Sequence, residues 1–206
     1  MRTRMPKAQR VTGLVDAAVA EFLERGYEGA SMERIASRAG VTKGGLYHHF
    51  PGKDALLIFA TQALAQPVFR ILTNAMSQAS PVGGLARYIK GSLGFWARRP
   101  RQLELFFLTM TKLAESPDAR RGYSGSYRET TEAVATLYRR GLEAGELRGL
   151  EPRATALALV AALDGALGMI LIDPRQTATA TAAAIHRALV GAFTVGPQAT
   201  ARRRTP

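Results

Sequence analysis

The segment from Thr42 to Phe50, TKGGLYHHF, carries a hydroxyl, an ammonium, a phenol and two imidazoles within nine residues. Such groups donate hydrogen bonds to phosphate oxygens and to base edges, which are the two kinds of contact that nucleic acids offer. Lys43 could donate to guanine O6 and N7 or to a phosphate, and the sequence does not choose between them. The chemistry indicated by this segment is recognition of DNA.

Two adjacent glycines, Gly44 and Gly45, interrupt the segment. Each costs a helix about 1 kcal/mol relative to alanine, so the pair needs a reason. Either the missing side chains let the backbone approach a DNA groove closely, or the start of the helix is frayed. The sequence leaves both interpretations open.

Two short helices around a tight turn must position these groups. Ser31 is a good cap for the first helix and Thr42 for the second. Gly40 stands where a left-handed residue ends the first helix. Leu46 and Phe50 lie four residues apart and supply the buried face of the second helix. This is a helix-turn-helix pattern, whose second helix can enter a DNA major groove with its N-terminal residues foremost.

The flanking residues extend the pattern. Apolar residues at helical spacing across residues 11–23 predict a first helix that supports the motif, and Gly26 is expected to end it. Pro51 ends the second motif helix. Lys53 combines a cation with the start of the next helix, so its ammonium and the backbone N–H could hold one phosphate. Ser31 could also give its hydroxyl to a phosphate.

The run from Gly26 to Leu57, GYEGASMERIASRAGVTKGGLYHHFPGKDALL, resembles the DNA-binding domain of the tetracycline-repressor (TetR) family of transcription regulators. The resemblance implies a dimer of all-helical subunits that represses promoters and releases DNA when a small molecule binds. It also implies that Gly44 and Gly45 face bases, that Tyr47 contacts a phosphate, and that His48 contacts a base or a phosphate. From the residues alone, Tyr47 could instead pack against the first helix. The expected DNA-contacting residues are Ser31, Thr42, Lys43, Gly44, Gly45, Tyr47, His48 and Lys53.

Composition narrows the class of protein. The 206 residues carry a formal net charge of +12, which favours polyanionic partners, and include no cysteine, which suits a reducing cytoplasm. The basic N-terminus lacks the apolar stretch of a secretory signal. The longest apolar stretch, residues 154–172, is interrupted by Asp164. This pattern favours a buried interface helix over a membrane span. We expect a cytoplasmic protein with no catalytic site, no metal site and no cofactor.

The helix-start and helix-stop signals in the rest of the chain predict an all-α fold of about nine helices in two domains. Residues 1–52 form a three-helix helix-turn-helix domain, in which residues 1–9 are either a frayed end or an arm that reaches DNA. Residues 53–195 form a helical domain for ligand binding and dimerisation. Residues 196–206 are expected to be a disordered basic tail.

A second group of residues suits an apolar ligand site, because aromatic rings and methionines give an adaptable lining. Asp164 stands in the middle of an apolar helix, where it could bind ligand, face an arginine across a dimer, or reach solvent. Ordinary core packing is the alternative for each of the others. The candidate pocket residues are Tyr88, Phe95, Trp96, Phe106, Phe107, Met110, Tyr123, Tyr127, Asp164 and Met169.

The last two helices offer apolar surface that could pair with a second copy as a four-helix bundle. The alternative is that the same residues form the core of one subunit. The candidate interface residues are Val160, Leu163, Leu167, Ile170, Leu171, Ile185, Leu189 and Phe193. The leading interpretation is a ligand-responsive repressor that binds a palindromic operator as a dimer. A transcriptional activator, or a helical small-molecule-binding or oligomerisation protein with a vestigial DNA motif, remain as alternatives.

Overall fold

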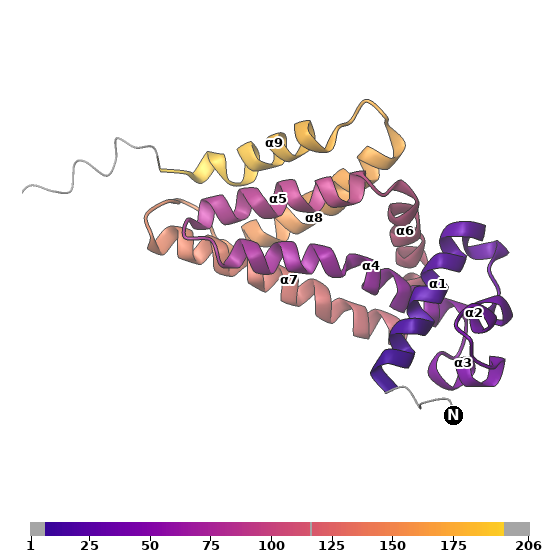
Figure 1. Ribbon diagram of the computed structural model, residues 1–206. Coiled ribbons are helices and arrows are strands. Elements are labelled where there is room, and N and C mark those ends of the chain that lie inside the picture. Colours follow the sequence, from indigo (N-terminus) through magenta and orange to yellow (C-terminus); the bar gives the residue numbers. More distant parts are fainter. Residues whose placement is uncertain (1–6, 116, 196–206) are drawn as a thin grey trace, which may run out of the picture. The chain divides into compact units, whose positions relative to one another are not determined.

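The computed structural model describes residues 7–115 and 117–195 (Figure 1). The predicted tail, residues 196–206, and the start of the N-terminal arm lie outside this range. The described residues contain nine α-helices and no β-strand, which confirms the all-α class. The helices are α1 (Lys7–Gly29), α2 (Met32–Arg38), α3 (Lys43–His49), α4 (Lys53–Met76), α5 (Pro81–Ala97), α6 (Pro100–Glu115), α7 (Pro117–Glu143), α8 (Pro152–Ile172) and α9 (Ala178–Leu189), followed by a short 3-10 turn, Gly191–Phe193.

Prolines begin several of these helices. Pro81, Pro100 and Pro117 each open a helix, because proline lacks the N–H that the first turn leaves unpaired in any case. Ser80 completes the start of α5, since its Oγ accepts a hydrogen bond from the Gly83 backbone at 3.1 Å. The segment from Ser80 to Gly84 is therefore a capped helix start.

The chain forms two compact units, which we describe separately. The first unit comprises residues 1–66 and 99–123, and the second comprises residues 67–98 and 124–206. The division falls within α4 and α7 and not at the predicted boundary between residues 52 and 53. The reason is that α6 shares a core with the helix-turn-helix: Leu105 of α6 is buried in the same cluster as Phe22 and Leu57.

The first unit packs α1, α2 and α3 with the start of α4 and with α6. Phe22, Ile35 and Leu46 are at most 1% exposed and form the centre of this core. Thr61 of α4 and Thr109 of α6 are also buried, and their hydroxyls form a hydrogen bond at 2.7 Å. This bond satisfies two polar groups that burial would otherwise penalise, and it fixes the position of α6 along α4.

The second unit packs α5 against α8 and α9 (Figure 1). Gly84 permits the close approach of α4 and α5, because a Cβ at this position would lie 2.5 Å from the Ala75 carbonyl oxygen. Tyr138 of α7 is fully buried, and its hydroxyl donates to the Leu189 carbonyl at 2.7 Å, where it satisfies the end of α9. Burial raises the pKa of Tyr138 well above its ordinary value, so the phenol is a donor at all physiological pH values.

Candidate nucleic-acid interface

The turn between α2 and α3 is built as the sequence indicates. The Ser31 Oγ accepts from the Arg34 backbone N–H at 3.3 Å, and the Thr42 Oγ1 accepts from the Gly45 N–H at 3.1 Å. Gly40 has a φ of 67°, which is the left-handed conformation that glycine adopts without strain. Leu46 is 0% exposed and holds α3 against the other two helices. The motif therefore has one buried anchor and one free face.

The free face of α3 consists of the residues that the sequence singled out. Thr42, Lys43, Gly44, Gly45, Tyr47 and His48 are all exposed. Tyr47 is 44% exposed, so its side chain is not buried within the first unit. These residues offer hydroxyl, ammonium, phenol and imidazole groups along less than two turns of helix.

The two glycines of α3 differ in what surrounds them. A Cβ at Gly45 would lie 3.2 Å from the Thr42 Oγ1, so a side chain there would crowd the cap. A Cβ at Gly44 would meet no heavy atom within 4 Å. Both residues are helical and neither has a positive φ. The subunit itself therefore gives no packing reason for glycine at Gly44.

Lys43 is the main cation of this face. Its ammonium pairs with the Glu33 carboxylate and lies 5.9 Å from the centre of the Tyr47 ring. The hydrogen bond between Lys43 and Glu33 raises the pKa of the lysine and lowers the pKa of the glutamate. Both side chains are more than half exposed, so water screens the pair strongly. A phosphate could replace Glu33 as the partner of Lys43.

Lys53 has partners inside the first unit. Its Nζ donates to the Tyr27 carbonyl at 2.8 Å and to the Ala30 carbonyl at 3.3 Å, and it lies 4.2 Å from the centre of the Tyr27 ring. The Tyr27 hydroxyl in turn donates to Asp54. The side chain of Lys53 thus fixes the end of α1 on the start of α4. Its predicted phosphate contact rests on the backbone N–H groups at the start of α4.

Glu21 supports the motif, and the sequence analysis did not find it. It is 2% exposed, and its carboxylate lies 2.7 Å from the Arg34 Nε and 3.4 Å from both the Arg25 Nε and an Arg38 nitrogen. Arg38 also pairs with the exposed Glu24, which lowers the pKa of that carboxyl. A glutamate within the apolar stripe of α1 was the available signal. Its ion pairs join α1 to α2.

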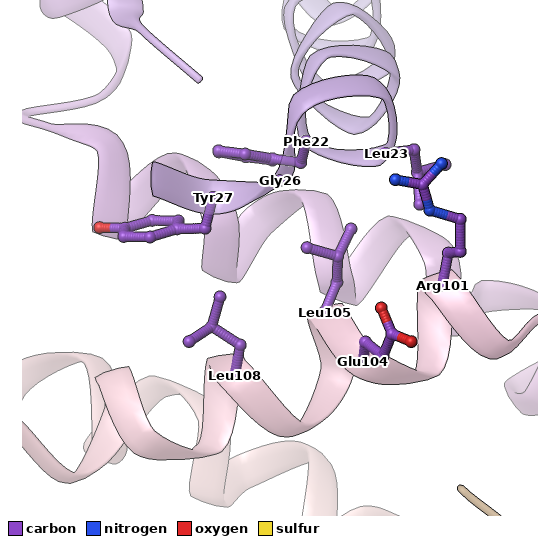
Figure 2. A pocket seen from close by; sticks show the side chains of 8 residues that line it. All are labelled: Phe22, Leu23, Gly26, Tyr27, Arg101, Glu104, Leu105 and Leu108. Atoms are coloured by element: carbon purple, nitrogen blue, oxygen red, sulfur yellow. The ribbon is translucent and has the colours of Figure 1, made fainter. Parts of the chain in front are cut away.

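A small pocket lies beside this core, between α1 and α6 (Figure 2). It has a volume of about 160 Å³ and borders Gly26, where α1 breaks with φ 71° and ψ 173° before one further turn to Gly29. The predicted helix end at Gly26 is therefore a break inside α1. The pocket is lined by Phe22, Leu23, Gly26, Tyr27, Arg101, Glu104, Leu105 and Leu108.

The ten candidate pocket residues do not all lie in one unit. Phe106, Phe107, Met110 and Tyr123 belong to the first unit, and the other six belong to the second. Within the second unit, the Tyr127 hydroxyl donates to the Asp164 Oδ2 at 2.8 Å. Burial raises the pKa of Asp164, and this hydrogen bond partly offsets the rise. Burial, followed by the Asp164 charge, raises the pKa of Tyr88 far above its ordinary value.

Four predictions on α8 need correction. Val160, Leu163 and Leu167 are 4–7% exposed within a single subunit, so they are core residues and have no surface left for a partner. Met169 is 54% exposed and is not part of an enclosed lining. The predicted stripe was shifted around the helix, because α8 is apolar on nearly every side and its periodicity could not choose a face. The exposed face of α8 carries Leu157, Ala158, Ala161, Gly165, Met169 and Ile172.

The comparisons with known proteins agree with this geometry. Residues 14–58 match the family described as bacterial regulatory proteins, tetR family, and residues 81–194 match the C-terminal domain of BetI-type transcriptional repressors. The chain belongs to the TetR family. It is 26% identical over 152 residues to the HTH-type transcriptional regulator RutR of Escherichia coli K12, an alignment that covers 74% of this chain and 70% of RutR.

Solved structures extend the likeness over the whole TetR-family fold. A putative transcriptional regulator from Pseudomonas aeruginosa PAO1 is 26% identical, with a TM-score of 0.75, and the match covers 98% of this chain and 97% of that one. The complex of SmeT with triclosan has a TM-score of 0.71 at 23% identity, covering 93% and 94%, and SmeT is the repressor of a Stenotrophomonas maltophilia multidrug efflux pump. The protein is thus a helix-turn-helix transcriptional regulator.

Two helices of this TetR-family chain, α4 and α8, are long and apolar enough to cross a membrane by length and composition alone. Core helices of water-soluble proteins pass the same test, and both helices belong to the fold just described. Among the described residues, no three histidine or acidic side chains gather in a way that could hold a metal ion.

Proposed function

We propose that this regulator is a cytoplasmic repressor that binds a palindromic operator as a homodimer and releases it when a small, largely apolar effector binds. The observation that carries the proposal is the free face of α3. It presents hydrogen-bonding side chains around a glycine whose missing side chain the subunit does not require. A backbone that must approach base edges closely gives that glycine a purpose.

The roles of the eight residues follow from their positions. Lys43 and His48 would donate to base edges or phosphates, and Tyr47 would donate to a phosphate. Gly44 and Gly45 would allow α3 to lie deep in the major groove. Thr42 and Ser31 already cap their helices, and their hydroxyls could share a phosphate. Lys53 would hold the start of α4 against the backbone of the DNA.

A dimer follows from the limited reach of one motif. Two recognition helices that read successive major grooves must lie about 34–36 Å apart, which requires a two-fold assembly. The exposed face of α8 offers the apolar surface for it: Leu157 is 61% exposed and Ile172 is 83% exposed. Small residues, Ala158, Ala161 and Gly165, lie between them and would let two copies of α8 approach closely. Five further candidate interface residues are partly buried in the single subunit: Ile170, Leu171, Ile185, Leu189 and Phe193.

Two observations support a small-molecule effector: polar groups inside the second unit, and a ligand bound to a protein of similar structure. SmeT, which shares the fold, is solved with triclosan bound. In this chain Tyr88, Tyr127 and Asp164 bring polar groups together inside the second unit. Binding there would favour one of two arrangements of the dimer and so change its affinity for the operator.

The test is selection of binding sites from random DNA by the full-length protein. We expect enrichment of two inverted half-sites whose centres are about one helical turn apart. A Lys43→Ala, Tyr47→Ala double variant should bind the selected site at least tenfold more weakly and with a smaller dependence on salt. Leu157→Glu should convert the protein to monomers in analytical ultracentrifugation and reduce operator affinity in parallel.

Three outcomes would count against the proposal. Failure to enrich any site would favour a small-molecule-binding protein with a vestigial motif. Unchanged affinity of the double variant would remove α3 from the interface. A reporter placed behind the selected site that loses expression in the absence of the regulator would indicate an activator and not a repressor.

A further inference from the structure

A second pocket lies wholly within the second unit, between α5 and α9. It has a volume of about 370 Å³, and residues within 86–90 of α5 and 179–187 of α9 line it. We call it the α5–α9 pocket. An apolar cavity of about 150 Å³ in another protein holds benzene, so this pocket has room for a ring or a short alkyl chain together with a polar group.

The floor of the α5–α9 pocket is apolar. Ile89 of α5 and Ala182 of α9 are buried, and Ala86 and Ala183 also line the pocket. Because the alanines carry only a methyl group, they leave space between the two helices that larger side chains would fill. A floor of this kind favours the hydrocarbon part of a ligand, since hydrocarbon that covers it is removed from water.

The charged residues of the pocket all have one sign. Lys90 of α5 and Arg187 of α9 are exposed and line the pocket from different helices. No acidic residue is among the lining residues, and within the described part of the chain neither cation forms an ion pair with a carboxylate. A pocket lined by charges of one sign attracts ions of the opposite sign. The pocket therefore favours an anion.

His186 gives a second and independent reason to expect a polar ligand. Its imidazole lines the same pocket, and its Nε2 is buried and makes no hydrogen bond within residues 7–115 and 117–195. A buried polar atom without a partner is costly, so this nitrogen needs an explanation. Rotation of the ring about the Cβ–Cγ bond changes which ring atoms face the pocket. An anionic oxygen there could then accept the hydrogen bond that Nε2 lacks.

The α5–α9 pocket is separate from the other sites of the second unit. Neither Tyr127 nor Asp164 lines it. Ala183 and Ile185 are two residues apart on α9, so their side chains point to nearly opposite sides of the helix. The pocket therefore does not use the side of α9 that carries Ile185, a candidate interface residue.

We propose that the α5–α9 pocket binds a small organic carboxylate, that is, an apolar chain or ring with one carboxylate group. Its oxygens lie between Lys90 and Arg187 and accept a hydrogen bond from His186, and its hydrocarbon part covers Ile89 and the alanines. Because charge-assisted hydrogen bonds are stronger than neutral ones, the acid binds more tightly than an alcohol of similar shape. The inference goes beyond the proposed function, since this site requires neither DNA nor a dimer.

The test compares acids with similar alcohols by titration calorimetry on the purified full-length protein near pH 7. The pairs are octanoate and octan-1-ol, 4-phenylbutyrate and 4-phenylbutan-1-ol, and cyclohexylacetate and 2-cyclohexylethanol. In at least one pair the acid should bind about tenfold more tightly than the alcohol. In a Lys90→Gln, Arg187→Gln double variant this preference should fall to about twofold or less. An Arg87→Gln, Arg153→Gln double variant removes the same charge from exposed residues outside the pocket and should keep the preference.

Two further measurements locate the bound acid. Ala183→Leu fills the pocket and should weaken binding of the acid at least tenfold, whereas Ala184→Leu, at an exposed neighbour that does not line the pocket, should not. The chain has only three histidines, so their imidazole 15N resonances can be assigned by NMR. The resonance of His186 Nε2 should shift when the acid is added, and the resonances of His48 should not. Circular dichroism confirms that each variant is folded.

The proposal is overturned if none of the six molecules binds, or if acids and alcohols bind equally well to the wild-type protein. It is also overturned if the preference survives in the Lys90→Gln, Arg187→Gln variant, if Ala183→Leu binds the acid as tightly as the wild type, or if the His186 resonance does not move. Operator binding is measured on the same preparations without the acids. A wild-type protein that binds the acids but selects no operator would contradict only the proposed function.

Discussion

Two acids of this protein, one in each unit, have different surroundings. Glu21, in the first unit, is surrounded by three arginines. Asp164, in the second unit, has a single hydrogen bond from a neutral tyrosine. A buried charge is costly unless it is paired, so Glu21 is fully buried only beside its arginines, whereas Asp164 is partly exposed and has one neutral partner. The difference separates a residue that joins α1 to α2 through ion pairs from one that makes a single hydrogen bond at the edge of α8.

The largest effect on stability is expected at Glu21, which pairs with three arginines. Glu21→Gln keeps the size of the side chain but leaves three arginines without their shared anion. We expect the first unit to lose about 2 kcal/mol of stability, as for hydrogen bonds to a charged group. Urea unfolding followed by circular dichroism measures it. A loss no larger than that of the exposed control Glu24→Gln would mean that Glu21 is not the centre of the network.

The arginines should rank by distance and hydrogen bonding. Arg34→Ala should lower the unfolding midpoint most, because its Nε lies 2.7 Å from Glu21 and its guanidinium also donates to the Gly29 carbonyl. Arg38→Ala should follow, since Arg38 also pairs with Glu24. Arg25→Ala should have the smallest effect, because Arg25 makes one 3.4 Å contact and is half exposed. A reversed order would contradict the role given to α2 in holding the motif.

Asp164→Asn should act in the opposite direction and more weakly. Because burial raises the pKa of Asp164 in the folded protein, folding favours the protonated acid. The contribution of Asp164 to the stability of the wild-type protein is therefore fully present below the pKa of this acid in the unfolded chain. It is lost as the pH rises through the pKa of Asp164 in the folded protein. Asparagine avoids this loss, so the variant should melt about 2 °C higher near neutral pH and at the same temperature as the wild type near pH 3. A lower melting temperature at neutral pH would show that the charge is already paired.

The smallest effect on stability is expected for an exposed pair. Glu33→Gln removes the partner of Lys43 on the free face of α3. The midpoint of unfolding should not change measurably, because solvent screens such pairs. Operator affinity should rise about twofold, because Lys43 no longer has to break its ion pair with Glu33 before it binds a phosphate. A fall in affinity would assign Glu33 a direct role in positioning Lys43 on the DNA.

Residues whose neighbours are close in the chain were predictable from the sequence. The caps at Ser31 and Thr42, the turn at Gly40 and the anchor Leu46 depend on local geometry, and all four lie as expected. The buried face of α8 was not predictable, because a helix that is apolar all round carries no signal for which side is buried. Val160 and Leu163 were assigned to a partner for that reason and are core residues of one subunit.

Partners distant in the chain were equally hidden. Nothing in the sequence brings Tyr127 to Asp164, which lies 37 residues further along the chain, or directs the Lys53 ammonium back to Tyr27. The place of α6 in the first unit was hidden for the same reason, because Leu105 is buried in the core of the helix-turn-helix. Residues placed by packing between helices, and not by their own helix, were the ones that required the structure.

The central claim is that α3 reads DNA with its glycine-containing end, and Gly44→Ala tests it most directly. Alanine at this position meets no atom of the subunit within 4 Å, so it should stabilise the fold by about 1 kcal/mol. The account predicts that the same variant binds the selected operator at least tenfold more weakly, while Gly125→Ala, another helical glycine with open surroundings, leaves the affinity unchanged. A Gly44→Ala protein that is stable and binds the operator as tightly as the wild type would contradict the account.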